Sequence, residues 1–186
     1  MAAKSNRVRI IGGDWRSRRI SFPDHEGLRP SADRVRETLF NWLGQDLNGQ
    51  ICLDLFAGSG ALGFEALSRG AARVVMVERS RRVCEALRRN AELLAAKNLQ
   101  LHCADALEFA TALAADGTER FDVVFLDPPF NSTMLAQVLP KLAFLLRPGA
   151  RVYVESAAAF TQTGGWQIVR HGRAGQVHFT LVTYDA

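Results

Sequence analysis

Residues 51–60 read ICLDLFAGSG, an apolar run that ends in a loop containing two glycines. A short apolar run bounded by turn residues predicts a buried strand, and the glycines let the chain turn at once into a helix. That helix is expected from Ala61 to Ser68, followed by Gly70, a residue typical of helix C-termini. The stretch therefore predicts the first strand–loop–helix unit of an α/β fold.

The same alternation continues outward from this unit. Further strands are expected at 73–77, 99–103, 121–126 and 151–155, and further helices at 81–97, 106–115 and 134–146. Apolar strands that alternate with helices are typical of a parallel sheet with helices on both faces. The last two strands, 166–169 and 177–183, are too close in sequence for a parallel crossover and should form an antiparallel hairpin. We predict an α/β, Rossmann-like seven-stranded sheet with a terminal antiparallel hairpin, which resembles a methyltransferase core.

A basic extension, residues 1–46, precedes the core domain, residues 47–186. Residues 7–22 should form a β-ribbon with a turn at 12–14, and a helix is expected from Ala32 to Leu43 with Ser31 as its N-cap. Residues 1–36 hold nine basic and four acidic residues, a net charge of +5, whereas the remaining 150 residues carry −1. This asymmetry predicts a polyanionic partner, although a merely solvated arm would have the same composition.

The glycine loop indicates a nucleotide-like ligand. Residues 58–63, GSGALG, match G-x-G-x-x-G, and Glu78 follows Gly58 by 20 residues, a spacing that also fits an NAD-dependent oxidoreductase. Asp54 favours S-adenosylmethionine, because its carboxylate can face an ammonium group but would repel a pyrophosphate. Asp105, after the third strand, could accept a hydrogen bond from adenine, cap the next helix, or do both.

Glu78 could bind ribose hydroxyls, or it could be a surface acid paired with Arg79 or Arg81. The start of the predicted helix at Ser31 is expected to lie over the same ligand. The expected cofactor-binding residues are therefore Ser31, Asp54, Ala57, Gly58, Ser59, Gly60, Glu78, Arg79, Asp105 and Ala106.

Residues 121–130, FDVVFLDPPF, indicate a buried strand that ends in a rigid turn. The two prolines lack N–H donors, and an ionised Asp127 only accepts hydrogen bonds. The turn therefore suits a substrate group that donates hydrogen bonds. The NH₂ group of a nucleic-acid base fits, bonded to the Asp127 carboxylate and the Pro128 carbonyl, with Phe130 stacked on the base. The predicted catalytic residues are Asp127, Pro128, Pro129 and Phe130; the alternative is a plain turn.

Four stretches together, RIIGG at 9–13, LRPSADRVRETLFNWL at 28–43, LDLFAGSG at 53–60 and FLDPPF at 125–130, resemble the RsmD family of bacterial 16S rRNA guanine-N2 methyltransferases. One departure is Ser31, where Thr is expected. The resemblance implies S-adenosylmethionine as cofactor and a guanine of 16S rRNA as substrate, at position 966, in the small ribosomal subunit or an assembly intermediate. It gives the basic extension a role in contacting RNA phosphates, through Arg7, Arg9, Arg16, Arg18, Arg19, Arg29 and Arg34.

Two other functions stay open: an N6-adenine methyltransferase acting on DNA or another RNA, and a non-catalytic RNA-binding assembly factor. Asp127 alone does not separate adenine from guanine, since both bases carry an NH₂ group. The chain has no apolar run of membrane-helix length and no recognisable secretory signal. Cys52, Cys84 and Cys103 lie far apart and are expected to be reduced. We expect a cytoplasmic monomer without a metal or a membrane partner.

Overall fold

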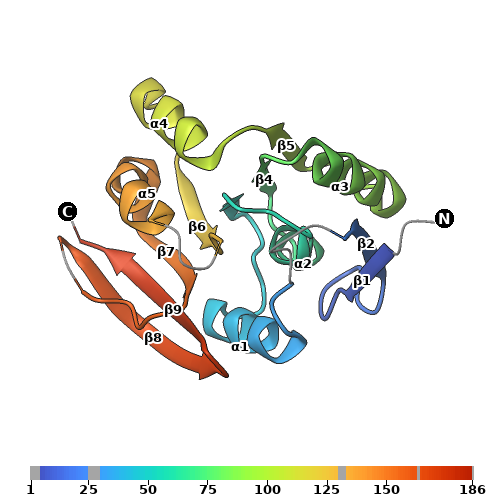
Figure 1. Ribbon diagram of the computed structural model, residues 1–186, viewed down its shortest axis with the longest axis horizontal. Coiled ribbons are helices and arrows are strands. Elements are labelled where there is room, and N and C mark those ends of the chain that lie inside the picture. The colour runs from blue at the N-terminus through green and yellow to red at the C-terminus, as the bar shows by residue number, and fades with distance from the viewer. Residues whose placement is uncertain (1–4, 25–29, 130–132, 163, 186) are drawn as a thin grey trace.

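The computed structural model describes residues 5–24, 30–129, 133–162 and 164–185, so Arg29 and Phe130 lie outside the described residues. Helices cover both faces of a seven-stranded sheet (Figure 1). Its strands are β3 (Ile51–Asp54), β4 (Arg73–Glu78), β5 (Leu99–Cys103), β6 (Phe121–Leu126), β7 (Leu146–Ser156), β8 (Trp166–Ala174) and β9 (Val177–Tyr184). They lie in the order β5-β4-β3-β6-β7-β9-β8, and β9 runs antiparallel to both of its neighbours. The predicted sheet and its terminal hairpin are confirmed.

Two layers of helices bury the two faces of the sheet. One layer is α1 (Asp33–Leu43), α2 (Ala61–Ser68) and α3 (Arg81–Leu94), and the other is α4 (Ala106–Asp116), α5 (Met134–Leu142) and the 3-10 turn η1 (Ala143–Leu145). Val123 and Phe125 of β6 pack into the first layer, and Val124 and Leu126 pack into the second. The central strands are apolar runs because both of their faces are buried. None of the described helices is long and apolar enough to cross a bilayer.

The extension folds onto the core. β1 (Ser5–Arg9) and β2 (Arg19–Pro23) form an antiparallel ribbon beside α3 (Figure 1). Ile10 and Ile20 are buried in the same hydrophobic cluster as the α1–α3 layer. Gly13, at φ 72°, lies so close to the end of α2 that a Cβ there would collide with the Ser68 carbonyl group. The extension and the core domain share one hydrophobic cluster, so the division of the chain into an RNA-binding extension, residues 1–46, and a catalytic domain, residues 47–186, stays a prediction.

Buried Glu65 of α2 holds the extension in place. Its carboxylate accepts hydrogen bonds from the backbone N–H groups of Ile11 and Gly12, at 2.8 and 2.7 Å. It also forms ion pairs with Arg36, at 3.4 Å, and Arg69, at 2.8 Å. Arg36 is buried too, and its other acceptors are the Arg9 and Ser31 carbonyl oxygens and the Asp33 carboxylate. Arg36, one of the nine basic residues of the arm, is therefore an interior group rather than a surface charge.

The prediction of Ser31 as a helix N-cap is wrong. The N-cap of α1 is Ala32, with no side-chain capping bond, and the Ser31 hydroxyl donates to the Glu155 carboxylate instead. A hydrogen bond from a hydroxyl group to a carboxylate is charge-assisted, and it is stronger than the neutral bond that the hydroxyl would accept from a backbone N–H group as a cap. The helix predicted over 81–97 ends at Leu94, because Ala95 adopts the left-handed conformation, φ 53°.

Two boundaries near the C-terminus also differ. The helix predicted to Leu146 ends at Leu142, and residues 147–149 lie within β7, where a register shift relative to β6 accommodates the Pro-Gly pair. β8 continues to Ala174, so most of the loop predicted at 171–175 is strand. At Gly172 the Phe179 ring fills the space that a side chain would need.

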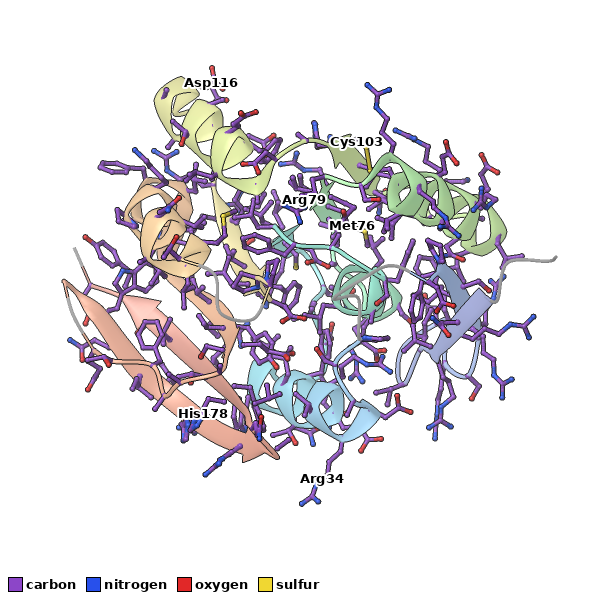
Figure 2. All side chains as sticks on the ribbon, viewed as in Figure 1. Arg34, Met76, Arg79, Cys103, Asp116 and His178 are labelled. Carbon is purple, nitrogen blue, oxygen red and sulfur yellow. A yellow bond between two sulfur atoms is a disulfide. The ribbon has the colours of Figure 1, made fainter. Side chains whose placement is uncertain are left out.

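The expectation of three reduced cysteines is wrong for two of them. Cys84 of α3 and Cys103 at the end of β5 form a disulfide, with Cα atoms 6.1 Å apart (Figure 2). The separation of 19 residues between the two cysteines did not predict a disulfide. The parallel pairing of β4 with β5 is what brings Cys103 close to Cys84. Cys52 is free, and burial is the main cause that raises the pKa of its thiol to about 12.

Candidate active site

The centre of the site is the point where the strand order reverses. The chain leaves β3 toward β4 and β5 and then returns to β6 on the other side of β3. Ligands of open α/β sheets bind at such a switch point, beyond the carboxyl ends of the strands. Asp54 ends β3 and lies opposite Phe125 of β6, and Asp127 follows two residues later on the same face. The two carboxylates therefore flank the switch point.

Asp54 is almost fully buried, and one of its oxygens accepts a hydrogen bond from the Gly63 N–H at 3.0 Å. The pKa of Asp54 is raised to about 7, mainly by burial; the hydrogen bond from the Gly63 N–H acts against this rise, and the nearby Glu78 carboxylate contributes to it. A buried carboxylate is stabilised in its ionised form by a cation. S-adenosylmethionine, the ligand expected from the sequence, carries such a cation in its ammonium group.

The glycine loop passes between β3 and α2 with little space around it. Gly58 and Gly60 have φ values of 50° and 80°, which favour glycine. A Cβ on Gly60 would lie 2.6 Å from Leu87 and 2.7 Å from Phe64, so the position has no room for a side chain. Ala57 and Ser59, also predicted to bind the cofactor, are buried in this loop.

Glu78 supports the glycine loop. Its carboxylate accepts hydrogen bonds from the Gly58 N–H at 3.1 Å and the Ser80 N–H at 2.7 Å. Within the described ranges it forms no ion pair with Arg79 or Arg81, so the structure does not support the alternative of a surface pair. Each carboxylate oxygen has two acceptor sites, so Glu78 can still accept from ribose hydroxyls. Arg79 is exposed.

Asp105 is the N-cap of α4, which confirms one of its two predicted roles. Its Oδ1 accepts from the Leu107 and Glu108 N–H groups at 2.8 and 3.1 Å. Its Oδ2 takes no part in these bonds and remains available as an acceptor. Asp105 follows Cys103, the partner of Glu78 in the β4–β5 register, so both acids lie at the same edge of the sheet. Ala106 is buried behind it.

A second acid, Glu155, lies beside Asp127, and the sequence analysis missed it. Leu126 pairs with Val154, so Asp127 and Glu155 are the next residues on two neighbouring parallel strands. Glu155 is buried and accepts from the Tyr153 hydroxyl at 2.8 Å, as well as from Ser31. The signal that marked Asp54 and Glu78, an acid at the end of a predicted strand, was present here too.

Burial raises the pKa of Asp127 well above its usual value, and the neighbouring Glu155 and Asp54 carboxylates raise it further. Burial also raises the pKa of Glu155, against the hydrogen bonds from Ser31 and Tyr153, which lower it. Asp127 is partly exposed, Pro128 is buried and Pro129 is exposed. Together these residues form an acceptor-rich site that favours a hydrogen-bond donor.

A hollow of about 490 Å³ lies between the ribbon and the start of α1, lined by Arg7, Arg9, Arg19 and residues 30–33. Of the other arginines predicted to bind RNA, Arg16 is exposed and Arg18 donates to the Leu93 carbonyl at 2.6 Å. Arg34 projects from α1 away from the sheet (Figure 2). The hollow therefore joins a cluster of arginines to Ser31, which contacts Glu155.

The sheet order, the glycine loop and the row of strand-end acids define the class of protein, a Rossmann-like methyltransferase. Residues 8–183 match the family model described as Conserved hypothetical protein 95. The Ribosomal RNA small subunit methyltransferase D of Escherichia coli K12 is 43% identical over 187 residues, covering 98% of this chain and 92% of that protein. The protein of the same name in Haemophilus influenzae is 39% identical, covering 94% and 92%. This chain belongs to that family, the RsmD family of methyltransferases.

Solved structures agree with this assignment. Escherichia coli yhhF is 41% identical, with a TM-score of 0.86 over 97% of this chain and 99% of that chain. T. thermophilus RsmC, an rRNA N2 G1207 methyltransferase solved with AdoMet and guanosine, is 22% identical with a TM-score of 0.74, covering 98% of this chain and 50% of that chain, a likeness of fold. S-adenosylmethionine is the methyl donor of this family of enzymes.

Proposed function

We propose that this protein transfers a methyl group from S-adenosylmethionine to the exocyclic N2 of a guanine in 16S rRNA, in the small ribosomal subunit or an assembly intermediate. The observation that carries the proposal is the acceptor-rich turn at Asp127, between the acids that suit the cofactor and a hollow lined by arginines. The names of its relatives support rRNA of the small subunit as substrate. Position 966 follows from the resemblance alone, and a cytoplasmic location and a monomeric state remain predictions.

Three acids along the sheet edge would each bind a different part of the cofactor. When bound, S-adenosylmethionine supplies a methyl group on a positively charged sulfur. Asp54 would face its ammonium group, Glu78 its ribose hydroxyls, and Asp105 its adenine amine through the free Oδ2. The close approach that Gly58 and Gly60 allow fits backbone contact with the ligand.

Asp127 and the Pro128 carbonyl would hold the reacting amine. The lone pair of an exocyclic amine is delocalised into the base, so the amine is a poor nucleophile. Hydrogen bonds from its two N–H groups to these acceptors orient the lone pair, and the Asp127 carboxylate stabilises positive charge that develops on nitrogen. The base must first be unstacked from its RNA neighbours.

Affinity for S-adenosylmethionine is expected to rise with pH through the pKa of Asp54. Because that pKa is about 7, Asp54 is mostly protonated in the free protein at pH 5.5 and must lose its proton to pair with the ligand ammonium. Titration calorimetry should show affinity rising by up to about tenfold per pH unit below pH 7 and levelling near it. Asp54→Asn should bind weakly at every pH. An equal pH dependence in Asp54→Asn would remove Asp54 from the ammonium site.

The proposed RNA face comprises the exposed arginines of the ribbon and of α3. The Asn90 side chain of α3 exchanges two hydrogen bonds with the Ser21 backbone, so the two elements form one surface. The net charge of residues 37–186 did not reveal the arginines of α3, because acidic residues elsewhere in that range cancel their positive charge. The exposed members are Arg7, Arg9, Arg16, Arg18 and Arg19 of the ribbon and Arg81, Arg82, Arg88 and Arg89 of α3.

Neutralising Arg7, Arg16 and Arg19 to glutamine should weaken RNA binding and reduce its salt dependence. Each lost phosphate contact lowers the slope of log K against log salt by about 0.7 to 0.9, so a loss of about 2 to 3 is expected. Filter binding over a salt series measures it. The matched control neutralises Lys141, Arg170 and Arg173 on α5 and β8, at the opposite end of the molecule (Figure 1). Equal slopes in the two triple variants would exclude the ribbon from the RNA face.

Transfer of a labelled methyl group from S-adenosylmethionine to free 16S rRNA, to small-subunit particles and to DNA tests the proposed reaction. Label is expected in the ribosomal RNA, either free or in particles. Label confined to DNA would favour the adenine alternative. Absence of label from every substrate, with S-adenosylmethionine bound, would favour a non-catalytic assembly factor.

A further inference from the structure

Five acids lie in a row along the carboxyl edge of the sheet, and four of them are proposed to bind the cofactor or the reacting amine. Across the sheet the row runs from Asp105 and Glu78 through Asp54 and Asp127 to Glu155, since β7 lies beyond β6 on the side away from β3. The cofactor occupies the side of the first three. A base whose amine is held at Asp127 must therefore extend toward Glu155.

One oxygen of Glu155 has no hydrogen-bond partner among the described residues. The Ser31 and Tyr153 hydroxyls both donate to Oε1, and no described group donates to Oε2. Glu155 is only 5% exposed, but among the described residues Thr180 alone has a fully buried side-chain polar atom without a partner, so Oε2 keeps some contact with solvent and a donor on a ligand can reach it. Ser31, which holds Oε1, also lines the hollow that contains the arginines, and the RNA would enter from that side.

We infer that Glu155 determines base specificity by accepting a hydrogen bond from guanine N1–H through its Oε2. The inference rests on the proposed function, since the amine at Asp127 must be guanine N2. Guanine carries an N1–H donor beside its 2-amino group, whereas adenine has a bare N1 acceptor beside its 6-amino group. Because donation of a hydrogen bond to a carboxylate favours its ionised form, guanine N1–H would stabilise an ionised Glu155 against its burial. The N1 acceptor of adenine would be repelled by that form, a distinction that Asp127 cannot make.

The test compares guanine with 2-aminopurine, placed at the methylated position of a reconstituted small-subunit RNA. 2-Aminopurine keeps the 2-amino group, but its N1 is an acceptor. The wild-type protein should methylate guanine about 10- to 100-fold faster, because one charge-assisted hydrogen bond is lost with 2-aminopurine. Equal rates for the two bases in the wild type would overturn the inference without any variant.

Glu155→Gln should reduce this preference to within about threefold, because the amide can accept from guanine N1–H or donate to the N1 of 2-aminopurine. Tyr153→Phe, the matched control, removes a hydrogen bond to Oε1 but keeps the carboxylate, so its preference should equal that of the wild type. If Glu155 only anchors Ser31 and Tyr153, Glu155→Gln would slow both substrates equally, and the unchanged ratio would overturn the inference. Failure of the proposed function is distinct: the wild type would then form no N2-methylguanosine.

Discussion

Replacement of Asp127 by alanine is expected to lower the rate of methyl transfer by about 10²- to 10³-fold, the usual effect of removing one preorganised group that stabilises developing charge. The variant loses the carboxylate that orients the amine, while the Pro128 carbonyl and the rest of the turn stay in place. S-adenosylmethionine affinity should stay within about threefold of the wild type, because Asp54, Glu78 and Asp105, the acids expected to bind it, lie on β3, on β4 and in the loop after β5. Single-turnover transfer and titration calorimetry measure the two effects separately.

The matched control for this substitution is Asp116→Ala, at the exposed end of α4 (Figure 2), which should leave both quantities unchanged. Transfer by Asp127→Ala at a near-normal rate would refute its catalytic role. Loss of cofactor binding together with activity would instead place Asp127 in the cofactor site.

Replacement of Glu65 by alanine is expected to lower the free energy of unfolding by about 3 to 5 kcal/mol, the typical cost of leaving a buried charge without its partner. The substitution leaves Arg36 and Arg69 without their shared carboxylate, and it removes the acceptor of the Ile11 and Gly12 N–H groups. Urea denaturation measures the loss.

Glu92→Ala, an exposed glutamate on α3, is the control and should change the free energy of unfolding by less than about 0.5 kcal/mol. A loss below about 1 kcal/mol in Glu65→Ala would show that the network does not hold the extension on the core.

The parts of the fold that the sequence predicted best are those where local pattern and burial agree. α2 and β6 have the predicted bounds, because apolar runs there end near a glycine or at an Asp-Pro pair; β5 also has the predicted bounds, although it is a largely exposed edge strand. β8 was predicted too short, since an exposed edge strand needs no apolar pattern. The Cys84–Cys103 disulfide depends on which strands pair, and that is a property of the tertiary fold.

The sequence could predict those site residues that lie at the end of a single predicted strand, but not those that depend on contacts between distant segments. Glu78, Asp105 and Asp127 each follow a predicted strand, Asp54 lies near the end of the strand predicted over 51–56, and the sheet brings the four acids to one edge. Ser31 satisfied the local pattern of an N-cap, but its hydroxyl bonds to Glu155, a residue 124 positions away. Arg36 was counted as surface charge, because composition records how many charges a segment has and not where the fold places them.

Mass-spectrometric mapping of the modified nucleoside tests the proposed reaction most directly. Small-subunit particles that lack the modification are incubated with S-adenosylmethionine and either the wild-type protein or Asp127→Ala, and their 16S rRNA is then digested. We predict N2-methylguanosine at one position with the wild-type protein and none with the variant. N6-methyladenosine, or N2-methylguanosine formed equally by both proteins, would contradict guanine-N2 methylation at Asp127.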